Sequence, residues 1–289
     1  MRRYVALLKV VEVGSFTKAA ELLGYTQPAL SQMIASLEKE LSIKLLRRSR
    51  QGIRLTPEGE RLCPAVREAV ARYEAMRRAA DEIRGLEAGI VRIGTVSSVS
   101  AHWLPKVIHA FWQDHPGVQV ELRQGDYTSI AEWIRTGEVD FGFVNPAAVK
   151  GLETARVKAG EFRAVVPTGH PLTTKGSVTL EELARQPLLL LEEGAYSEPM
   201  EAFREAGLAP NIKMRAHDDY TLLSMVEEEL GVTVLAELVL RKTSYSVATL
   251  PIEPAITREM AVAAKDLDAL PLASKAFIEY LMERTGELA

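Results

Sequence analysis

The first 41 residues carry apolar side chains at helical intervals, and this pattern predicts three helices. The first helix has an apolar face formed by Tyr4, Leu7, Leu8 and Val11. A Gly-Ser-Phe break at residues 14–16 precedes a second helix, which Thr17 can cap. This second helix is expected to bury Ala19, Ala20 and Leu23. A Gly-Tyr-Thr turn at residues 24–26 then leads into the third helix.

The third helix has an unusual polar face. Thr26 can cap it and Pro28 suits its first turn. Its apolar stripe consists of Leu30, Ile34, Leu37 and Leu41. The opposite face carries Pro28, Ser31, Gln32, Ala35 and Lys39. Solvated helix faces usually carry Glu and Lys, so these small residues and amide donors indicate a surface that contacts a partner.

Two short helices joined by a tight glycine turn are typical of a helix-turn-helix, whose second helix enters the DNA major groove. Gln can bond adenine N6 and N7 there, and Ser can bond base edges or phosphates. The following segment "IKLLRRSRQGIRLT" alternates around Gln51-Gly52, which predicts a β-hairpin. Its arginines could reach phosphates or a minor groove, or form only a solvated basic hairpin: Arg47, Arg48, Arg50 and Arg54.

Charge supports the DNA-binding interpretation. Residues 1–56 hold ten bases and four acids, a formal charge of +6, whereas the whole 289-residue chain carries −4. The rest of the chain is therefore acidic, at −10. A small basic head on an acidic body suggests a nucleic-acid-binding module joined to a second function.

A long helix is expected after the head, because Thr56 and Pro57 form a typical helix start. Its apolar residues alternate spacings of four and three, which indicates a coiled-coil dimer seam of Leu62, Val66, Ala69, Tyr73, Met76, Ala80 and Ile83. The alternative is a helix that lies on its own domain. Pro64 should bend the helix or separate its first turns. The segment "GLEAG", ending at Gly89, suggests a hinge.

From Ile90 onward, predicted strands alternate with predicted helices, which favours βαβ units and a largely parallel sheet. Ligands of such sheets bind beyond the carboxyl ends of strands. The candidate effector-binding residues in these loops are Ser97, Ser98, Ser100, Thr128, Asn145, Glu193, Tyr196 and His217. Their hydroxyls suit a small carboxylate, although Ser100 and Thr128 could be helix caps only. Asp126, Glu193 and Asp218 argue against a purely anionic ligand or imply an additional cationic group.

Several classes of protein receive no support from the sequence. No P-loop, Gly-x-Gly-x-x-Gly or Gly-x-Ser-x-Gly motif occurs, so an enzyme is not expected. His102 and His109 have no ligand partner at suitable spacing, so we expect no metal and no cofactor. The single cysteine, Cys63, excludes an internal disulfide, and no apolar run approaches a membrane span or a signal peptide. These features predict a cytoplasmic protein that does not contact a membrane.

The segment "VEVGSFTKAAELLGYTQPALSQMIASLEKELSIKLLRRSRQGIRLTPEG" resembles the winged helix-turn-helix of the LysR-type transcriptional regulators. The resemblance implies that Gln27, Pro28, Ser31 and Gln32 face the major groove and that Arg48 and Arg50 contact the backbone or minor groove. It also implies an antiparallel pairing of the long helix. Ser42 stands where the family usually has Gly, and Leu46 where it has Phe.

The body is similar, more loosely, to the two-lobed, periplasmic-binding-protein-like α/β effector domain of the same family. The predicted organisation is a DNA-binding domain over residues 1–56, a linker helix and hinge over 57–89, and an effector domain over 90–289. Lobe I is assigned to residues 90–161 and 266–289, and lobe II to 162–265, with crossings near Phe162 to Val166 and near Ala261 to Lys265. Glu229 replaces a common Gly and Ala236 a common Pro.

These expectations combine into a sequence-specific transcriptional regulator whose effector binds between the lobes. The resemblance implies homodimers joined into a homotetramer that bends double-stranded DNA and contacts RNA polymerase. Two alternatives stay open at this point. The chain could be an α/β solute-binding or enzymatic protein with an accessory basic head, or an architectural DNA binder without an effector.

Overall fold

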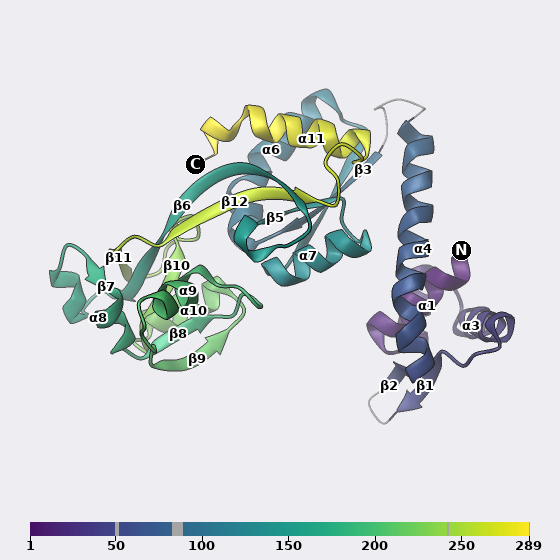
Figure 1. The fold of residues 1–289 in the computed structure, drawn as a ribbon, viewed down its shortest axis with the longest axis horizontal. Helices are drawn as coiled ribbons and strands as arrows, with labels where there is room; N and C mark the ends of the chain where they lie inside the picture. The colour runs from purple at the N-terminus through teal and green to yellow at the C-terminus, as the bar shows by residue number, and fades with distance from the viewer. Residues whose placement is uncertain (50–51, 83–88, 242, 289) are drawn as a thin grey trace. The chain divides into compact units, whose positions relative to one another are not determined.

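The computed structural model describes residues 1–49, 52–82, 89–241 and 243–288 and divides the chain into two units, Met1–Ile83 and Arg84–Ala289 (Figure 1). Each unit has its own hydrophobic core. Most of the predicted hinge at residues 85–89 lies outside the described residues.

The first unit contains the predicted three helices and hairpin: α1 (Arg2–Val13), α2 (Phe16–Leu23), α3 (Gln27–Leu41), β1 (Leu46–Ser49) and β2 (Gly52–Leu55). Leu7, Leu30 and Leu37 lie in its core. The predicted cap of α3 is confirmed, since the Thr26 hydroxyl accepts a hydrogen bond from the Ala29 amide at 3.4 Å. The cap of α2 is not Thr17. Ser15 has the extended backbone of an N-cap, so its hydroxyl accepts from the Lys18 amide.

Glu38 anchors the hairpin to α3, a role that the sequence analysis did not assign. It is 8% exposed, and Oε1 accepts from the amides of Leu45 at 2.8 Å and Leu46 at 3.1 Å. Lys44 Nζ donates to Oε2 at 2.7 Å. Burial alone would raise the pKa of Glu38, but the hydrogen bonds from Lys44, Leu45 and Leu46 together hold it below its ordinary value.

The long helix α4 (Pro57–Glu82) starts where predicted, with the Thr56 hydroxyl accepting from the Gly59 amide at 3.0 Å. It continues through Pro64 as one helix. Of the predicted seam, Val66 is buried in the core of the head and Leu62 is half-buried against it. The first turns of α4 therefore lie on their own domain, which was the alternative interpretation.

Farther along α4 the predicted seam faces solvent in the single chain. Ala69 is exposed, Tyr73 is 37% exposed and Met76 is 61% exposed. The side chain of Ala80, and Ile83 as a whole, lie outside the described residues. Dimerisation through Ala69, Tyr73 and Met76 thus stays a prediction.

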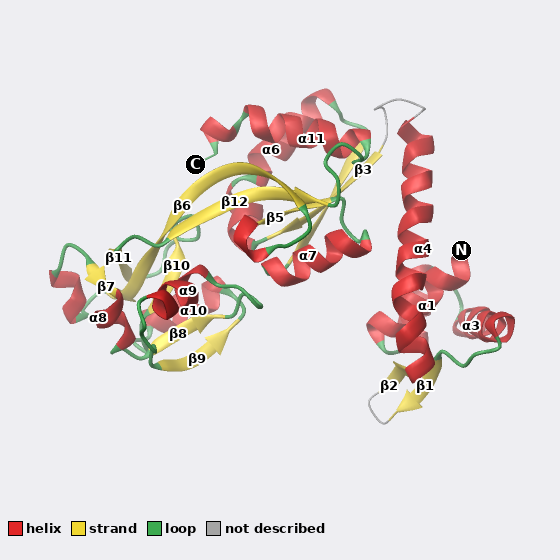
Figure 2. Ribbon diagram, viewed as in Figure 1, coloured by secondary structure: helices red, strands yellow, loops and turns green. Residues whose placement is uncertain are grey.

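In the second unit, lobe I has a parallel arrangement of three strands in the order β4-β3-β5. Helices α6 and α11 cover one face of these strands and α7 covers the other (Figure 2). The core between them contains Phe111, Phe141, Phe143 and Phe277. The elements are β3 (Gly89–Thr95), α5 (Ser97–His102), α6 (Leu104–Asp114), β4 (Val118–Gln124), α7 (Tyr127–Thr136), β5 (Phe141–Val144), η1 (Pro146–Ala148), α11 (Leu272–Glu283) and η3 (Thr285–Glu287).

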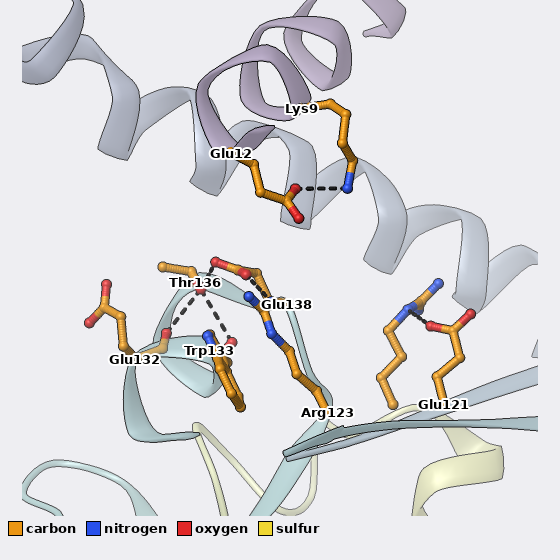
Figure 3. A network of polar contacts seen from close by, with 9 residues as sticks. Lys9, Glu12, Glu121, Arg123, Glu132, Trp133, Thr136 and Glu138 are labelled. Atoms are coloured by element: carbon orange, nitrogen blue, oxygen red, sulfur yellow. Dashed lines mark hydrogen bonds and ion pairs between the residues drawn. The ribbon is translucent and has the colours of Figure 1, made fainter. Parts of the chain in front are cut away.

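Polar contacts at the end of α7 fix this helix to strand β4. The Thr136 hydroxyl donates to the Glu132 carbonyl at 2.9 Å, and Glu138 accepts from Arg123 (Figure 3). The Arg123 guanidinium also lies 4.2 Å from the centre of the Trp133 ring. The other end of α7 begins at Tyr127, three residues after the end of β4.

Two long strands connect the lobes, β6 (Glu153–Pro167) and β12 (Thr257–Ala264), and they pair antiparallel from Thr257↔Glu161 to Ala264↔Glu153 (Figure 1). The expected return crossing near Ala261 to Lys265 is wrong by a few residues. Residues 261–263 already pair with β5 inside lobe I. Because these pairs are antiparallel, the body has a mixed sheet and not the largely parallel one expected.

Lobe II packs helices against strands paired to β6 and against a separate β8-β9 pair. The predicted alternation of strands and helices is present here, although strands β7, β9 and β11 were not predicted. The elements are η2 (Pro171–Thr174), β7 (Val178–Thr179), α8 (Leu180–Ala184), β8 (Leu188–Leu191), α9 (Glu198–Glu205), β9 (Ile212–Ala216), α10 (Asp219–Glu227), β10 (Thr233–Ala236) and β11 (Val247–Glu253).

Both departures from glycine noted in the sequence occupy left-handed backbone positions, Ser42 at φ 54° and Glu229 at φ 59°. A side chain in this region costs about 1 kcal/mol relative to glycine. We therefore expect Glu229→Gly to raise the free energy of unfolding by about 1 kcal/mol in urea titrations. Glu228, at φ −82°, is the matched control, and Glu228→Gly should give no stabilisation. Equal effects of the two substitutions would contradict this explanation.

Candidate functional site

A cavity of about 320 Å³ lies between the lobes of the second unit. Lobe I contributes the start of α5 and the turn before α7, and lobe II contributes the residues after β8 and the turn before α10. Strand β12 adds Arg258 from the connection between the lobes. The lining residues are Val96, Ser97, Ser98, Gln124, Gly125, Asp126, Tyr127, Leu191, Glu192, Glu193, His217, Asp218, Asp219, Ala236 and Arg258.

Arg258 is the central cationic group of this site. It is 5% exposed, and it donates from Nε to the Tyr127 hydroxyl at 2.8 Å and from Nη1 to the Ser98 hydroxyl at 3.1 Å. Burial disfavours its charge, but Tyr127, Glu193 and Glu198 raise the pKa of Arg258 above its ordinary value. It therefore stays charged. Within the part of the chain that the structure describes, no carboxylate oxygen comes within 4.0 Å of its nitrogens.

Three acidic residues surround Arg258 at longer range: Glu193, Glu198 and Asp219. Glu198 is 4% exposed, and its Oε1 accepts from Asn145 Nδ2 at 2.8 Å and from the Tyr127 hydroxyl at 3.1 Å. Its Oε2 is buried without a hydrogen-bond partner among the described residues. Asp219 accepts from the Ser97 hydroxyl.

Burial changes the acidity of two of these carboxyls. It is the main cause that raises the pKa of Glu193 to about 7, and the negative charges of Glu198 and Asp219 add to it against the opposing effect of Arg258. Burial likewise raises the pKa of Asp219, although the Ser97 hydroxyl and Arg258 oppose the change. The site therefore holds more acidic groups than one guanidinium can balance.

Four of the predicted effector residues line the cavity: Ser97, Ser98, Glu193 and His217. The other four lie close by but do not line it. The Ser100 hydroxyl donates to the Ser97 carbonyl at 2.9 Å, and Asn145 caps the short helix η1 while it bonds Glu198. Thr128 accepts from the Ala195 amide of lobe II at 2.9 Å, and Tyr196 is half-buried against the core of lobe I.

Several polar contacts join the lobes around the cavity. Ser97 of lobe I bonds Asp219 of lobe II, Thr128 of lobe I bonds the Ala195 amide, and Tyr127 bonds Glu198. A molecule that enters the cavity meets donors and acceptors from both lobes. The cavity is thus lined by polar groups of both lobes.

Arg258, which is central to the site, was not among the predicted residues, because those lie in loops after strands and Arg258 lies within a strand. A signal was available. Residues 257–260 read Thr-Arg-Glu-Met before a run of apolar residues, so strand alternation places Arg258 and Met260 on the same buried face. A charged residue at an inward position is uncommon and marks a candidate site.

In the first unit, the predicted DNA-contacting residues of α3 are accessible. Gln27, Pro28 and Gln32 are exposed, and Ser31 is half-buried on the same side. Arg54 on β2 is exposed. Arg48 belongs to β1 but its side chain is not described, and Arg50 lies outside the described residues.

The described residues contain no helix long and apolar enough to cross a membrane. They also contain no group of three or more His, Cys, Asp or Glu side chains arranged to hold a metal ion.

Comparisons with known proteins identify the family. Residues 1–60 match the model of the bacterial regulatory helix-turn-helix proteins of the lysR family, and residues 84–286 match the LysR substrate binding domain. The uncharacterized HTH-type transcriptional regulator YvbU of Bacillus subtilis is 32% identical over 96% of both chains. The transcriptional dual regulator GltC of the same species is 29% identical over 90% of this chain and 89% of its own.

A solved structure shows the same fold over nearly the full length. Full-length CbnR in complex with its target DNA superposes with a TM-score of 0.70, at 20% identity, over 98% of this chain and 99% of CbnR. The winged helix-turn-helix, the long α4 and the two-lobed body predicted from the sequence are thereby confirmed as the fold. The chain belongs to the LysR family of transcriptional regulators and carries that family's substrate-binding domain.

Proposed function

We propose that this protein binds specific DNA sequences through α3 and that a small molecule held between its lobes controls this binding. The observation that carries the effector part is the cavity itself, which charged and hydroxyl side chains of both lobes line around Arg258. A ligand that contacts both lobes binds one lobe arrangement better than another, and it can shift the equilibrium only by that difference in affinity.

The DNA-binding part of the proposal is supported by the exposed face of α3 and by the charge of the head. Gln27, Pro28, Ser31 and Gln32 form the side of α3 directed at the groove, and Arg48, Arg50 and Arg54 of the hairpin contact phosphates or the minor groove. CbnR, which has the same fold, has been solved with its target DNA. Such a regulator works in the cytoplasm, where it has access to the chromosome.

The oligomeric part of the proposal is based on α4. Tyr73 and Met76 are large apolar residues exposed in the single chain, at positions a partner helix would cover. A dimer through α4, and a tetramer through the bodies, would let one protein contact several DNA segments and RNA polymerase. The body serves as a sensor in this proposal, without turnover of its ligand.

The DNA-reading role of Gln32 has a direct test. Gln32→Ala should weaken binding to the cognate site by roughly 1–3 kcal/mol, because the amide can make two hydrogen bonds to one adenine. Binding to random DNA should hardly change. Fluorescence anisotropy with both duplexes at one salt concentration measures the two losses. Lys39→Ala, on the same helix face but beyond its N-terminal turns, is the control, and equal losses on both DNAs would show that Gln32 only positions the protein.

The effector role is tested with genomic fragments that the full-length protein retains. Footprints on these fragments should change when low-molecular-weight metabolites of the cell are added, and the change should disappear on dialysis. Footprints that never respond to any metabolite fraction would favour the architectural DNA binder. Consumption of a metabolite by the protein alone would favour the enzymatic alternative.

A further inference from the structure

We propose that the ligand of the cavity between the lobes is a small amino acid, a molecule that presents a carboxylate to Arg258 and an ammonium group to Glu193 and Asp219. This inference rests on the proposed effector function and adds the chemical class of the ligand. Three features of the cavity support it: an unpaired buried cation, an excess of acids opposite it, and the small size of the space.

The carboxylate end follows from the state of Arg258. A buried guanidinium normally pairs with a carboxylate or phosphate, because an unpaired buried charge is costly. Arg258 lines the cavity with only two neutral hydroxyls, of Tyr127 and Ser98, as hydrogen-bond acceptors. None of the hydrogen bonds found among the described residues uses its Nη2 atom. A ligand carboxylate would complete the ion pair that the chain itself does not make.

The ammonium end follows from the acids on the side of lobe II. Three acids of the cavity wall already have partners: Asp126 accepts from the Ser129 amide, Asp218 from the Thr221 amide, and Glu192 lies 3.3 Å from His217. Among the described residues, Glu193 and Asp219 face the space without an ion pair at 4.0 Å or less, and the charge of Arg258 acts on both from longer range. A cationic group of the ligand would balance them.

The charge balance excludes a ligand that carries only one of the two groups. Glu193, Glu198 and Asp219 surround a single guanidinium, so a ligand that is only an anion would add a negative charge to an acidic site. A simple amine would leave Arg258 without its ion pair. A molecule with both groups satisfies both sides, and a cavity of about 320 Å³ is at the lower end of ligand sites, which favours a single amino acid over a peptide or nucleotide.

Binding should be linked to proton release. Glu193 is faced by Arg258 on β12, Glu198 on α9, Asp219 on α10 and Tyr127 on α7, and it is half protonated near pH 7. An ammonium group beside it would favour the charged carboxylate and expel the proton. Affinity should therefore rise between pH 6 and pH 8, with release of about half a proton at pH 7.

The test uses the full-length protein and the twenty standard L-amino acids, each followed by melting temperature and then by calorimetry in two buffers of different ionisation enthalpy. The best amino acid is compared with its deamino acid and with its decarboxylated amine. We expect at least one amino acid to bind, with both analogues at least tenfold weaker, and with protons released into the buffer.

Two variants test which residue binds the ammonium group of the ligand and which binds its carboxylate. Glu193→Gln should lower the affinity for the amino acid at least tenfold and remove the proton release. Its affinity for the deamino acid should stay within twofold of the wild-type value. Arg258→Lys keeps the positive charge but loses the planar guanidinium that can bind a carboxylate with two hydrogen bonds. It should weaken binding of the amino acid and leave binding of the amine unchanged. Glu205→Gln, an exposed change on α9 away from the cavity, is the control. If Arg258→Lys fails to fold, Glu193→Gln alone decides.

The outcomes separate this inference from the proposed function. A deamino acid that binds as tightly as its amino acid and changes the DNA footprint would overturn the inference and leave the effector function intact. The same is true if none of the twenty amino acids binds while a metabolite fraction still changes the footprint. Binding of an amino acid that Glu193→Gln does not affect would also overturn it, because the ammonium group would then lie elsewhere.

Discussion

Glu38→Ala should lower the free energy of unfolding of the head by roughly 2–4 kcal/mol and abolish DNA binding well below the wild-type melting temperature. The carboxylate accepts from the amides of Leu45 and Leu46, and loss of the acceptor leaves buried donors without partners. Because these amides lead directly into β1, the hairpin should detach from α3 even where the helices persist.

Hydrogen exchange of peptides covering residues 43–47 measures the opening directly. Glu38→Gln keeps one acceptor oxygen and should lose about half as much stability. Glu40→Ala removes an exposed carboxylate of α3 that pairs with Arg3 of α1, and it should change stability by less than about 0.5 kcal/mol. Similar losses of stability in Glu38→Ala and Glu40→Ala would show that the hydrogen bonds of Glu38 to the hairpin contribute nothing to the free energy of unfolding.

The pH dependence of the head has a defined sign. Since the folded protein lowers the pKa of Glu38, the stabilisation is complete above the ordinary value of 4.5 and is lost as the pH falls through the lowered value. The wild-type head should therefore lose stability below about pH 4.5, and Glu38→Gln should flatten this part of the curve. Thermal melts between pH 3 and pH 6 give the comparison.

The helices of the head could be predicted from the sequence because their signals are local. The apolar stripe of α3, its Thr26 cap and the alternation of the hairpin strands each depend on residues a few positions apart. Glu38 could not be assigned in this way. It lies beside Leu37 at the edge of the stripe, and its partners are backbone amides seven and eight residues farther along the chain. Such a role appears only when the chain turns back on the helix.

The body shows where local patterns fail. The alternation of strand and helix segments was predicted, but the order and direction of strands depend on which segments cross between the lobes. Strand β12 pairs with β5 and β6 antiparallel, and this pairing makes the sheet mixed. The alternation of strands and helices along the sequence does not contain that information, so it predicted parallel neighbours.

The candidate site was predicted only in part, because local patterns do not show which segments meet where the chain crosses between the lobes. The rule that ligands bind at the ends of strands located Ser97, Ser98, Glu193 and His217 in loops that do line the cavity. Arg258 comes from the strand that returns between the lobes, and only the three-dimensional crossing brings it to Ser98, 160 residues away in sequence. Glu229, in contrast, could be recognised from the sequence alone. It stands where the family commonly has glycine, and its backbone is left-handed.

Glu193→Gln should stabilise the body at pH 8, although it removes an ionisable carboxyl from the wall of the cavity. The folded protein raises the pKa of Glu193 from 4.5 to about 7, mainly by burial. Below pH 4.5 the group is protonated in both the folded and unfolded chains and costs nothing. As the pH rises toward 7, the unfolded chain ionises freely while the folded chain resists, so stability is lost across this interval.

The size of this loss follows from the change in pKa at about 1.4 kcal/mol per unit. Because Glu193 is half-buried and partly screened by solvent, we expect about 2 kcal/mol of stabilisation in Glu193→Gln at pH 8 and none at pH 4.5. Urea titrations of the full-length protein at the two pH values provide the measurement, with the transition of the body followed separately by hydrogen exchange. The matched control is Glu192→Gln, whose carboxylate lies 3.3 Å from His217 near the surface.

Parallel stability curves for the wild type and Glu193→Gln between pH 4.5 and pH 8 would contradict the assignment. A gain in stability together with weaker ligand binding is the expected pattern for a residue kept for function at the expense of stability. The cost that Glu193 imposes on the empty protein is then a source of binding energy. A cationic group of the proposed ligand would pair with the carboxylate and offset this cost, so binding would stabilise the body as its occupancy rises.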